Sequence, residues 1–384
     1  MEGSTVGCVA GGAPRLSPPK AWIPRARSIL SGAMRQKAYA RAGVDIDLGN
    51  RVKATLPRLL ASTHRRGVLG KVGGFGGVFE LDLGKYSEPV LVSSVDGVGT
   101  KLKIAFALDR HDTIGQDLVN HCVNDIAVLG AEPLFFLDYL GTGKLESRVF
   151  TEIISGFAKA CAENHCALIG GETAQMPGFY QPGEYDVSGT IVGVVEKSRL
   201  LHGKTIRPGD TVLGLASSGL HTNGYSLARK ILFEQMKLKP SSRLQGLSGT
   251  VGEELLKVHV SYGPLVQKLL KKFNAGKDSS FALKGLAHIT GGGFVDNIPR
   301  VLPKRCDVVI HKGTWKMPPI FQVLQNQGGV PESELYQVFN MGIGMTLVVA
   351  AAQADVVLKF IRAQKQTAWR IGEVVKGRGA ARVI

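Results

Sequence analysis

The sequence has few cysteines and no long apolar run. Its five cysteines are odd in number and form no Cys-x-x-Cys pair: Cys8, Cys122, Cys161, Cys166 and Cys306. A disulfide framework is therefore not expected, and a reducing, cytoplasmic location is favoured. No second ligand pair accompanies Cys161 and Cys166, so the spacing also argues against zinc. No apolar stretch approaches the roughly 18–20 residues of a membrane span, which argues against a membrane protein.

The two commonest nucleotide-binding signatures are missing as well. No Gly-x-x-x-x-Gly-Lys-Ser/Thr loop is present, because Gly203-Lys204-Thr205 lacks the upstream glycine. No Gly-x-Gly-x-x-Gly sequence opens a predicted helix. A P-loop NTPase and a dinucleotide-binding dehydrogenase are both disfavoured.

Acidic residues are fewer than basic ones, 31 against 47, which gives a formal net charge of +16. Such an excess is common in nucleic-acid-binding proteins, and a non-catalytic protein of that kind is one alternative. The basic residues are scattered, however, and their longest runs are pairs such as Arg65-Arg66. No zinc-finger spacing or aromatic RNA-binding motif accompanies them. The charge favours an anionic small-molecule substrate and no nucleic acid.

The composition is that of a globular protein with two domains. Hydrophobic residues make up 44% of the 384 residues, and a chain of this length is typical of two domains with their own cores. The turn signature at 207–210 places the N-terminal domain at 37–205 and the C-terminal domain at 206–384. Residues 1–36 contain one acidic and five basic residues. They are interpreted as a disordered or targeting extension, and import into an organelle stays open.

Predicted strands and helices alternate along the chain, which indicates an α/β (α+β) fold. In the N-terminal domain we expect strands at Pro89–Val95, Leu134–Leu140 and Val187–Val195, and helices at Asp112–Leu129 and Glu146–Asn164. In the C-terminal domain we expect strands at Thr211–Ala216, Met345–Ala350 and Trp369–Val375, and helices at Tyr225–Gln235, Val251–Phe273, Val295–Val301 and Ala354–Ala363.

The first motif that suggests chemistry follows the strand at Pro89–Val95. It reads Asp96-Gly97-Val98-Gly99-Thr100-Lys101. A carboxylate at a strand end suits Mg²⁺, which prefers oxygen ligands. The glycines let backbone N–H groups approach a phosphate, and the lysine adds a positive charge. The motif predicts a magnesium–phosphate site, and an ordinary Asp-Gly turn is the alternative.

The predicted helix at Asp112–Leu129 has an unusual polar face. At 100° per residue, this face gathers Asp117, Asn120, His121, Asn124 and Asp125. A solvated helix face would normally carry Lys, Glu and Arg, because Asp and Asn are poorer helix formers. The face therefore predicts ligands for a cation, with a plain polar surface as the alternative.

Two glycine-rich segments follow the same logic in the N-terminal domain. Glu172 comes after Gly170-Gly171 and the apolar Cys166–Ile169, so it offers a further carboxylate at a strand end. Gly70–Gly77 is a loop of the kind that closes over phosphates, although glycine clusters are often plain linkers.

Two more such segments lie in the C-terminal domain. Ser217–Gly224 contains His221 and Asn223, and His288–Phe294 contains three consecutive glycines. Each segment precedes a predicted helix, where free backbone N–H groups bind anions. The pattern predicts phosphate or oxyanion sites, and structural histidines are the alternative.

Taken together, these motifs resemble the aminoimidazole ribonucleotide synthetases (phosphoribosylformylglycinamidine cyclo-ligases) of purine biosynthesis. The matching segments run in order through most of the chain: Ala42–Asp47, Gly73–Gly77, Asp96–Lys101, His111–Gly115, Val123–Asp125, Gly130–Tyr139, Gly170–Pro177, His221–Ser226 and His288–Phe294. The Asp96–Lys101 motif alone would indicate only the wider superfamily. Its thiamine-monophosphate kinases and selenophosphate synthetases are the alternative enzymes, although Lys71–Gly77 lacks the cysteine typical of the latter.

The resemblance implies a fold, a reaction and a set of partners. It implies a homodimer whose N-terminal sheets join into a barrel, with the C-terminal α/β domain completing each active site. The implied reaction is the ATP-dependent cyclisation of formylglycinamidine ribonucleotide to 5-aminoimidazole ribonucleotide, with Mg²⁺ as cofactor and a potassium ion left open. Gln175 departs from the family pattern, which has a glutamate at this position, and its role is left undecided.

The resemblance also implies a role for each site residue. Lys101, His221 and His288 would act in catalysis. The metal would be held by Asp96, Asp117, Asp125 and Glu172. The nucleotide would be bound by Gly73, Gly74, Gly76, Gly77, Asp96, Gly97, Gly99, Thr100, Lys101, Asn124 and Asn223.

Overall fold

The computed structural model describes residues 37–71, 73–276 and 281–384. Residues 38–384 form one compact unit, whereas the predicted extension at 1–36 lies outside the described residues. In the described part of the chain, no helix is long and apolar enough to cross a membrane.

The N-terminal half is built on a four-stranded sheet with the strand order β1-β4-β2-β3. Strand β4 is antiparallel to β1 and β2, whereas β2 and β3 are parallel and are joined through helix α6 (Ser147–Glu163). The strands are β1 (Pro89–Gly97), β2 (Glu132–Thr142), β3 (Ala167–Gln175) and β4 (Tyr185–Glu196).

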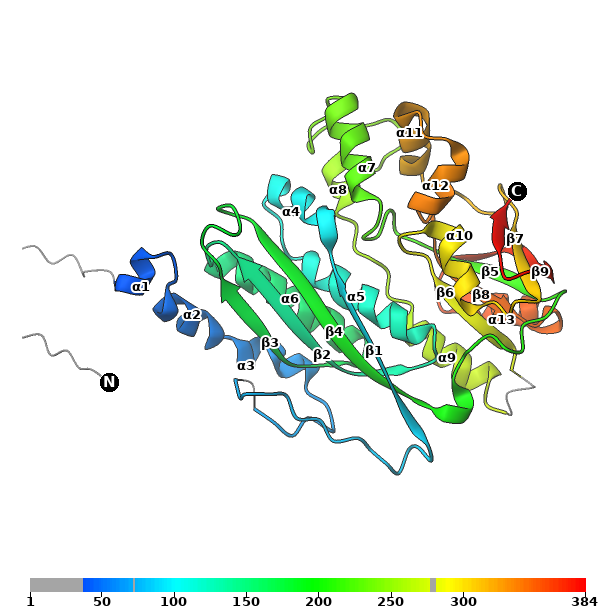
Figure 1. Ribbon diagram of the computed structural model, residues 1–384, viewed down its shortest axis with the longest axis horizontal. Helices are drawn as coiled ribbons and strands as arrows, with labels where there is room; N and C mark the ends of the chain where they lie inside the picture. Colours follow the sequence, from blue (N-terminus) through cyan, green and yellow to red (C-terminus); the bar gives the residue numbers. More distant parts are fainter. Residues whose placement is uncertain (1–36, 72, 277–280) are drawn as a thin grey trace, which may run out of the picture. The chain divides into compact units, whose positions relative to one another are not determined.

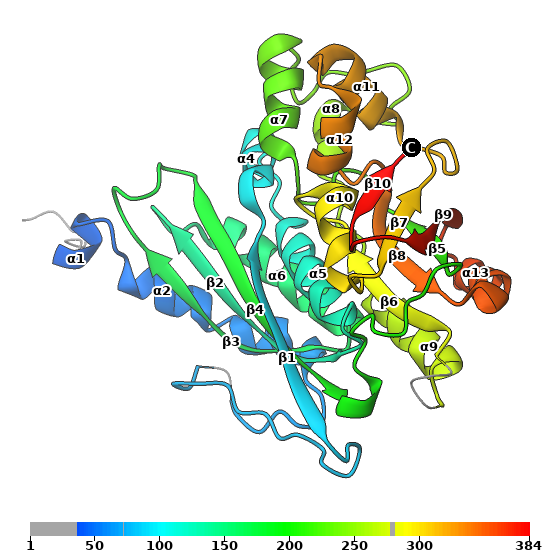
Figure 2. The same ribbon diagram turned by 45° about the vertical axis from the view of Figure 1, so that its right-hand side comes forward.

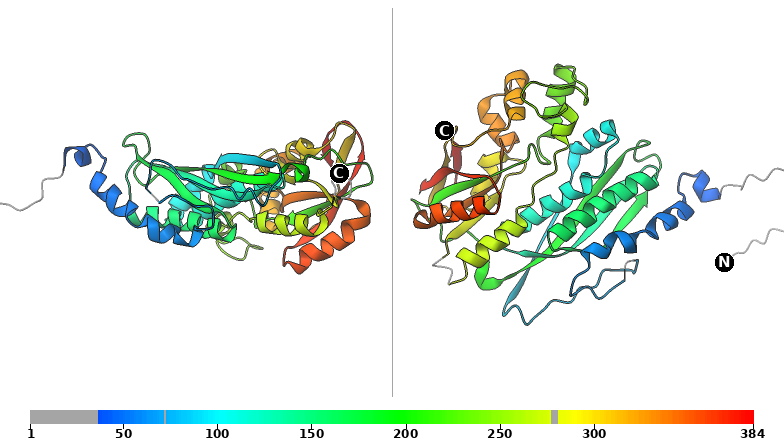
Figure 3. Two further views of the ribbon diagram at one scale, coloured as in Figure 1. Left: turned by 90° about the horizontal axis from the view of Figure 1, so that it is seen from below. Right: turned by 180° about the vertical axis from the view of Figure 1, so that it is seen from behind.

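Among the described residues, helices cover only one face of this sheet. Helix α5 (Ile114–Ala127) and helix α6 pack on it side by side, and Figure 1 and Figure 3 show them behind the strands in one view and in front in the other. Side chains of the opposite face, such as Leu91 and Val95, are 64% and 66% exposed. Shorter helices flank α6 or follow β1: α1 (Ala38–Arg41), α2 (Ile46–Lys53), α3 (Leu56–Leu60), η1 (Ala61–Thr63), η2 (Gly99–Lys101) and α4 (Leu102–Leu108).

The C-terminal half contains a six-stranded sheet with the order β10-β7-β9-β5-β8-β6. Its strands are β5 (Thr211–Ala216), β6 (Leu283–His288), β7 (Cys306–Ile310), β8 (Ile343–Val349), β9 (Ala368–Lys376) and β10 (Ala381–Val383). All seven residues of β8 are buried, as expected for a central strand with both faces covered.

Helices cover both faces of this second sheet (Figure 2). Val212 packs in the cluster that contains α10, whereas its neighbour Leu213 packs in the cluster that contains α9 and α13, because successive strand residues point to opposite faces. The helical segments are η3 (Lys197–Arg199), α7 (Tyr225–Arg229), η4 (Lys230–Gln235), α8 (Val251–Leu255), α9 (Gly263–Phe273), α10 (Gly293–Asn297), η6 (Ile298–Val301), α11 (Pro319–Gly328), α12 (Glu332–Val338), η7 (Ala351–Gln353) and α13 (Ala354–Ala363).

The structure confirms the α/β fold class but corrects one predicted element. The expected helix at Val251–Phe273 is two helices, α8 and α9, separated by a non-helical stretch at 257–262. Pro264 occupies the first turn of α9, a position that suits a helix start and not a helix interior. This stretch turns out to be central to the site.

Candidate functional site

The polar face of α5 binds the backbone of the non-helical stretch at 257–262. The Asp117 carboxylate accepts a hydrogen bond from the His259 N–H (2.8 Å), and Asn120 donates to the His259 carbonyl (2.8 Å). Asn124 accepts from the Tyr262 N–H (2.7 Å) and donates to the Val260 carbonyl (2.8 Å). Buried backbone groups need such partners. Asp117, Asn120 and Asn124, which we predicted to lie on a cation-binding face, therefore have a structural role.

Lys101 and Asp117 form a buried ion pair inside this arrangement. Both side chains are fully buried, and Lys101 Nζ lies 2.8 Å from a carboxylate oxygen of Asp117. Lys101 also donates to the carbonyls of His221 (3.1 Å) and Lys257 (2.7 Å). These contacts depart from the prediction that Lys101 neutralises phosphate and that Asp117 binds metal, because the two buried charges neutralise each other and neither residue lines the cavity described next.

His121 and Asp125, the other two residues of this polar face, line a cavity of about 560 Å³ between the two halves of the chain. Its N-terminal wall includes Asp96 at the end of β1 and Asp125 on α5, and its C-terminal wall includes His288 at the end of β6. The structure therefore brings together three of the predicted site residues from segments up to 192 positions apart in the sequence.

A row of hydrogen bonds connects the two carboxylates of this cavity. It runs from Asp96 to His121 (2.8 Å), to the Thr222 hydroxyl (2.8 Å) and to His259 (3.3 Å), with distances measured between the polar atoms. It continues from His259 to His288 (3.0 Å) and from His288 to Asp125 (2.8 Å). Asp125 also accepts from the Ser94 hydroxyl (3.1 Å).

Burial and the histidines act in opposite directions on these carboxylates. Burial by itself raises the pKa of Asp125, but the hydrogen bond from His288 and the nearby His121 hold its pKa below the usual range. The same holds for Asp96, where His121 and the Gly97 N–H oppose the effect of burial. Both groups are therefore ionised at neutral pH and offer oxygen ligands to a cation.

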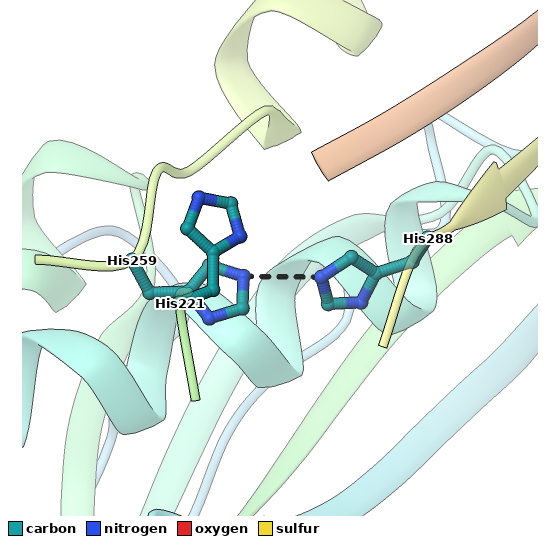
Figure 4. Close-up of side chains that lie close together, drawn as sticks. All are labelled: His221, His259 and His288. Carbon is teal, nitrogen blue, oxygen red and sulfur yellow. Dashed lines mark hydrogen bonds between the residues drawn. The ribbon is translucent and has the colours of Figure 1, made fainter. Parts of the chain in front are cut away.

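Three imidazoles cluster behind the cavity, and Figure 4 shows them together: His221, His259 and His288. They do not form a good metal centre, because the rings of His221 and His259 stack at 4.0 Å with an interplanar angle of 23°. Ligand lone pairs lie in the ring plane, so stacked rings cannot converge on one ion. Burial lowers the pKa of His221 and of His259 well below the usual range, so both rings are neutral.

The predicted nucleotide-binding residues are only partly gathered at this cavity. Gly99 has a φ of +67° at the turn after β1, where a glycine is favoured, and Thr100 Oγ1 lies 3.1 Å from the Ser226 hydroxyl of α7. A side chain at Gly291 would come 3.4 Å from Asn223 Oδ1, so the two predicted anion loops of the C-terminal half are neighbours.

The glycine-rich loop stands apart from the cavity in the described residues. A Cβ atom at Gly77 would lie 2.6 Å from Ile169 of β3. A Cβ atom at Gly73 or Gly76 would have no neighbouring atom within 4 Å among the described residues. Phe75 at its tip is fully exposed. The loop is open in this structure.

Glu172 also lies apart, on the other face of the N-terminal sheet. Asp96, Gly189, Asp138 and Gly171 are register partners across the four strands and so share one face. Glu172 is the next residue and points the other way, since side chains alternate along a strand. The structure does not bring Glu172 to the same metal position as Asp96.

Asp138, one of the four register partners just named, is a carboxylate that the sequence analysis missed. Burial, together with the nearby charge of Glu172, raises the pKa of Asp138 to about 7. Gly171 must be a glycine opposite it, because a Cβ there would come within 2.3 Å of Asp138 Oδ1. An acidic residue inside the apolar Leu134–Leu140 strand was the available signal.

Comparison with known proteins covers both halves of the chain. Residues 78–195 match the AIR synthase related protein family, N-terminal domain, and residues 207–384 match its C-terminal domain. Proteins called phosphoribosylformylglycinamidine cyclo-ligase are similar over 88–90% of the chain. The one from Trichlorobacter lovleyi is 53% identical over 336 residues (88% of this chain, 94% of the relative). The one from Geobacillus thermodenitrificans is 50% identical over 345 residues (90% and 97%).

Solved structures with the same fold are more distant in sequence. Thiamine-monophosphate kinase from Stenotrophomonas maltophilia has a TM-score of 0.62 at 17% identity, covering 86% of this chain and 95% of its own. The hydrogenase maturation protein HypE, solved in complex with ATP, has a TM-score of 0.60 at 17% identity (87% and 90%). At this identity the likeness concerns the fold alone.

Proposed function

This chain belongs to the AIR synthase related family, and on that premise we propose that it is a phosphoribosylformylglycinamidine cyclo-ligase. The observation that carries the proposal is identity of about 50% to cyclo-ligases over 88–90% of the chain. The two matched family domains, at 78–195 and 207–384, include Asp96, Asp125 and His288 of the cavity. The enzyme cyclises formylglycinamidine ribonucleotide to 5-aminoimidazole ribonucleotide and converts ATP to ADP and phosphate.

The reaction needs two steps at one carbon atom of the substrate. The amide oxygen takes the γ-phosphoryl group of ATP, which turns it into a leaving group. The amidine nitrogen then attacks the amide carbon, the ring closes, and phosphate departs. Phosphoryl transfer of this kind depends mainly on positioning and on neutralising the negative charge of the phosphates.

Asp96 and Asp125 are the residues that fit Mg²⁺. Both line the cavity and both are ionised, with His121 and His288 beside them to orient the carboxylates. A Mg²⁺ ion held there would neutralise phosphate charge. Lys101 and Asp117 instead keep α5 and the 257–262 stretch together, and Asn124 serves the same purpose.

The C-terminal wall supplies the groups for the ribonucleotide. His288 lines the cavity with one ring edge held by Asp125, which leaves the imidazole in a fixed orientation beside the reacting groups. Asn223 lies next to Gly291, where an amide side chain and backbone N–H groups suit an anionic substrate. Closure of the Gly73–Gly77 loop over the nucleotide completes this proposal.

The uncovered face of the N-terminal sheet supports a homodimer. Leu91 and Val95 point outward from β1, and no helix of the described residues covers them. An apolar sheet face of this kind is typical of a protein interface. A second copy would also cover the face that carries Glu172, so a further metal position there would belong to the assembled dimer.

The test is ADP release in the presence of Mg²⁺ with and without formylglycinamidine ribonucleotide. We expect turnover only when substrate and Mg²⁺ are both present. Thiamine monophosphate and selenide serve as comparison substrates for the other enzymes of this fold. Equal ADP release with and without formylglycinamidine ribonucleotide would rule out the cyclo-ligase function.

A further inference from the structure

Arg300 lines the same cavity as the two carboxylates, although it belongs to none of the motifs found in the sequence. It lies in the short helical segment η6, after the triple-glycine loop and α10. Asp96 and Asp125 give the cavity negative charge, so an arginine on its wall makes the charge of the cavity uneven. No step proposed above uses this residue.

The packing of β6 places Arg300 away from the carboxylates. Gly285 of β6 packs against Val301, the residue after Arg300, because a Cβ at Gly285 would lie 2.8 Å from the Val301 side chain. Gly285 precedes His288 by three residues, or about 10 Å of strand. Since His288 contacts Asp125 at 2.8 Å, the cavity has a carboxylate end and a distinct arginine end.

The segment that links the two halves of the chain forms the other wall at the arginine end. Gly203 has a φ of +72°, and a Cβ there would come 1.8 Å from the Val301 carbonyl oxygen. The linking segment is therefore pressed directly against η6. His202 and Arg300, which precede these two touching residues in the sequence, both line the cavity.

Basic residues dominate this end of the cavity. Residues 199–207 contain two arginines, one lysine and one histidine, and residues 300–305 contain two arginines and one lysine, with no acidic residue in either segment. Arg305 joins the two segments by donating to the carbonyls of Lys204 (2.9 Å) and Ile206 (3.2 Å). Arg300 makes no hydrogen bond or ion pair with any residue that the structure describes, so its guanidinium is available to a ligand.

The chemistry of the ribonucleotide matches this distribution of charge. Its 5′-phosphate and its reacting amide lie on opposite sides of the ribose. The carboxylate end suits Mg²⁺ and the phosphates of ATP, but it would repel a phosphate that carries no metal ion. An arginine presents a planar fork of N–H donors that matches a phosphate. A cavity of about 560 Å³ is also in the range of small-molecule sites.

We propose that Arg300 binds the 5′-phosphate of the ribonucleotide and so fixes the direction in which the substrate lies in the cavity. The proposal rests on the proposed function, because it takes this ribonucleotide as the substrate and places the reacting amide beside His288. The 5′-phosphate does not react, so its contact with Arg300 is equally strong before and during the reaction. Losing the contact should therefore raise KM and leave kcat nearly unchanged.

The kinetic test replaces Arg300 in the full-length enzyme. We expect Arg300→Gln to raise KM for the ribonucleotide at least about twentyfold, with kcat within about threefold and KM for ATP within about twofold. Arg300→Lys keeps the charge but loses the fork, so its rise in KM should be smaller. Lys304→Gln is the matched control, because Lys304 is an exposed cation of the same segment that does not line the cavity.

Two kinetic results would overturn the proposal. One is an unchanged KM for the ribonucleotide in Arg300→Gln. The other is a rise in KM for ATP in its place, which would assign Arg300 to the nucleotide. Melting curves confirm that each variant is folded.

The substrate without its phosphate separates phosphate binding from other effects of the substitution. As a competitive inhibitor, this ribonucleoside should bind the wild-type enzyme and Arg300→Gln with affinities within about twofold of each other, because neither complex contains the phosphate contact. If Arg300→Gln weakened the ribonucleoside as much as the ribonucleotide, Arg300 would act on another part of the substrate and the proposal would fail.

Phosphorus NMR of ribose 5-phosphate tests the contact without any turnover. We expect the wild-type protein and Lys304→Gln to broaden the phosphate signal, and Arg300→Gln to leave it sharp. Equal broadening by Arg300→Gln, or none by the wild-type protein, would refute phosphate binding by Arg300. If the wild-type enzyme showed no substrate-dependent ADP release, the proposed function would fail, whereas this measurement would still decide whether Arg300 binds a sugar phosphate.

Discussion

Replacing Asp125 with Asn tests whether the cavity binds a cation. The two side chains are nearly isosteric, and Asn costs no more helix propensity than Asp, so α5 should keep its packing. An Asn at this position still accepts from His288 and reaches the Ser94 hydroxyl. What disappears is one negative charge beside Asp96, in a site where the His288 hydrogen bond keeps the pKa of Asp125 low.

The expected effects on turnover and on stability differ in size. A cation held by two carboxylates loses one of them, and we expect turnover or nucleotide affinity to fall at least about tenfold, or roughly 1.4 kcal/mol. The Asp125 side chain is 25% exposed and keeps its partners, so the free energy of unfolding should fall by no more than about 1 kcal/mol. The magnesium dependence should shift to higher concentrations.

The assay is steady-state ADP release with formylglycinamidine ribonucleotide at several Mg²⁺ concentrations. Asp112→Asn is the matched control, because Asp112 precedes the same helix and its half-exposed carboxylate pairs with Arg110 at the surface. It should leave turnover and magnesium dependence unchanged. A folded Asp125→Asn enzyme with wild-type turnover and wild-type magnesium dependence would refute the metal-binding role of this carboxylate.

Three other substitutions test the structural roles assigned above. Asp117→Asn leaves Lys101 as an uncompensated buried charge and should lower the free energy of unfolding by about 3 kcal/mol in urea titrations; unchanged stability would contradict the ion pair. Val95→Glu places a charge on the uncovered sheet face and should convert the proposed dimer to monomers in light scattering, whereas a wild-type mass would contradict that interface. The raised pKa of Asp138, about 7, means that the folded state binds more protons than the unfolded state between pH 4 and 7. Stability from this group is present at pH 4 and lost as the pH rises through 7, so Asp138→Asn should stabilise the protein by about 1–2 kcal/mol at pH 8 and not at pH 4; an equal effect at both pH values would contradict the shift.

Local sequence patterns correctly predicted individual strands, helices and a motif at a strand end. Strand β5 and helix α13 have the predicted bounds, and the Asp96–Lys101 motif does end a strand at the cavity. The error at 251–273 arose because apolar spacing was read through Gly263-Pro264, a helix-start signal. Nothing local showed that α5 would meet residues 257–262, since these partners are 138–142 residues apart.

The same limit explains the mixed outcome for the polar helix face. Asp117 and Asp125 are both aspartates and lie eight positions apart on one helix. One meets a buried lysine and a backbone N–H, and the other meets the cavity, because the facing segments differ. Periodicity gives the face of a side chain but not its partner. His259 was missed for the same reason, since only its tertiary contacts distinguish it.

The binding of α5 to the 257–262 stretch also constrains how the chain folds. The residues that bind Asp117 and Asn124 are synthesised 138–142 residues after them. At the speed of translation, this separation corresponds to a delay of roughly 10 s. During that time the N-terminal half can form its sheet while the polar face of α5 remains hydrated. Docking of the later segment is then a long-range step, which the high sequence separation makes slow. Once docked, neither half can open this contact without exposing the buried Lys101–Asp117 pair, so heat should unfold residues 38–384 in one cooperative transition and not as two independent domains.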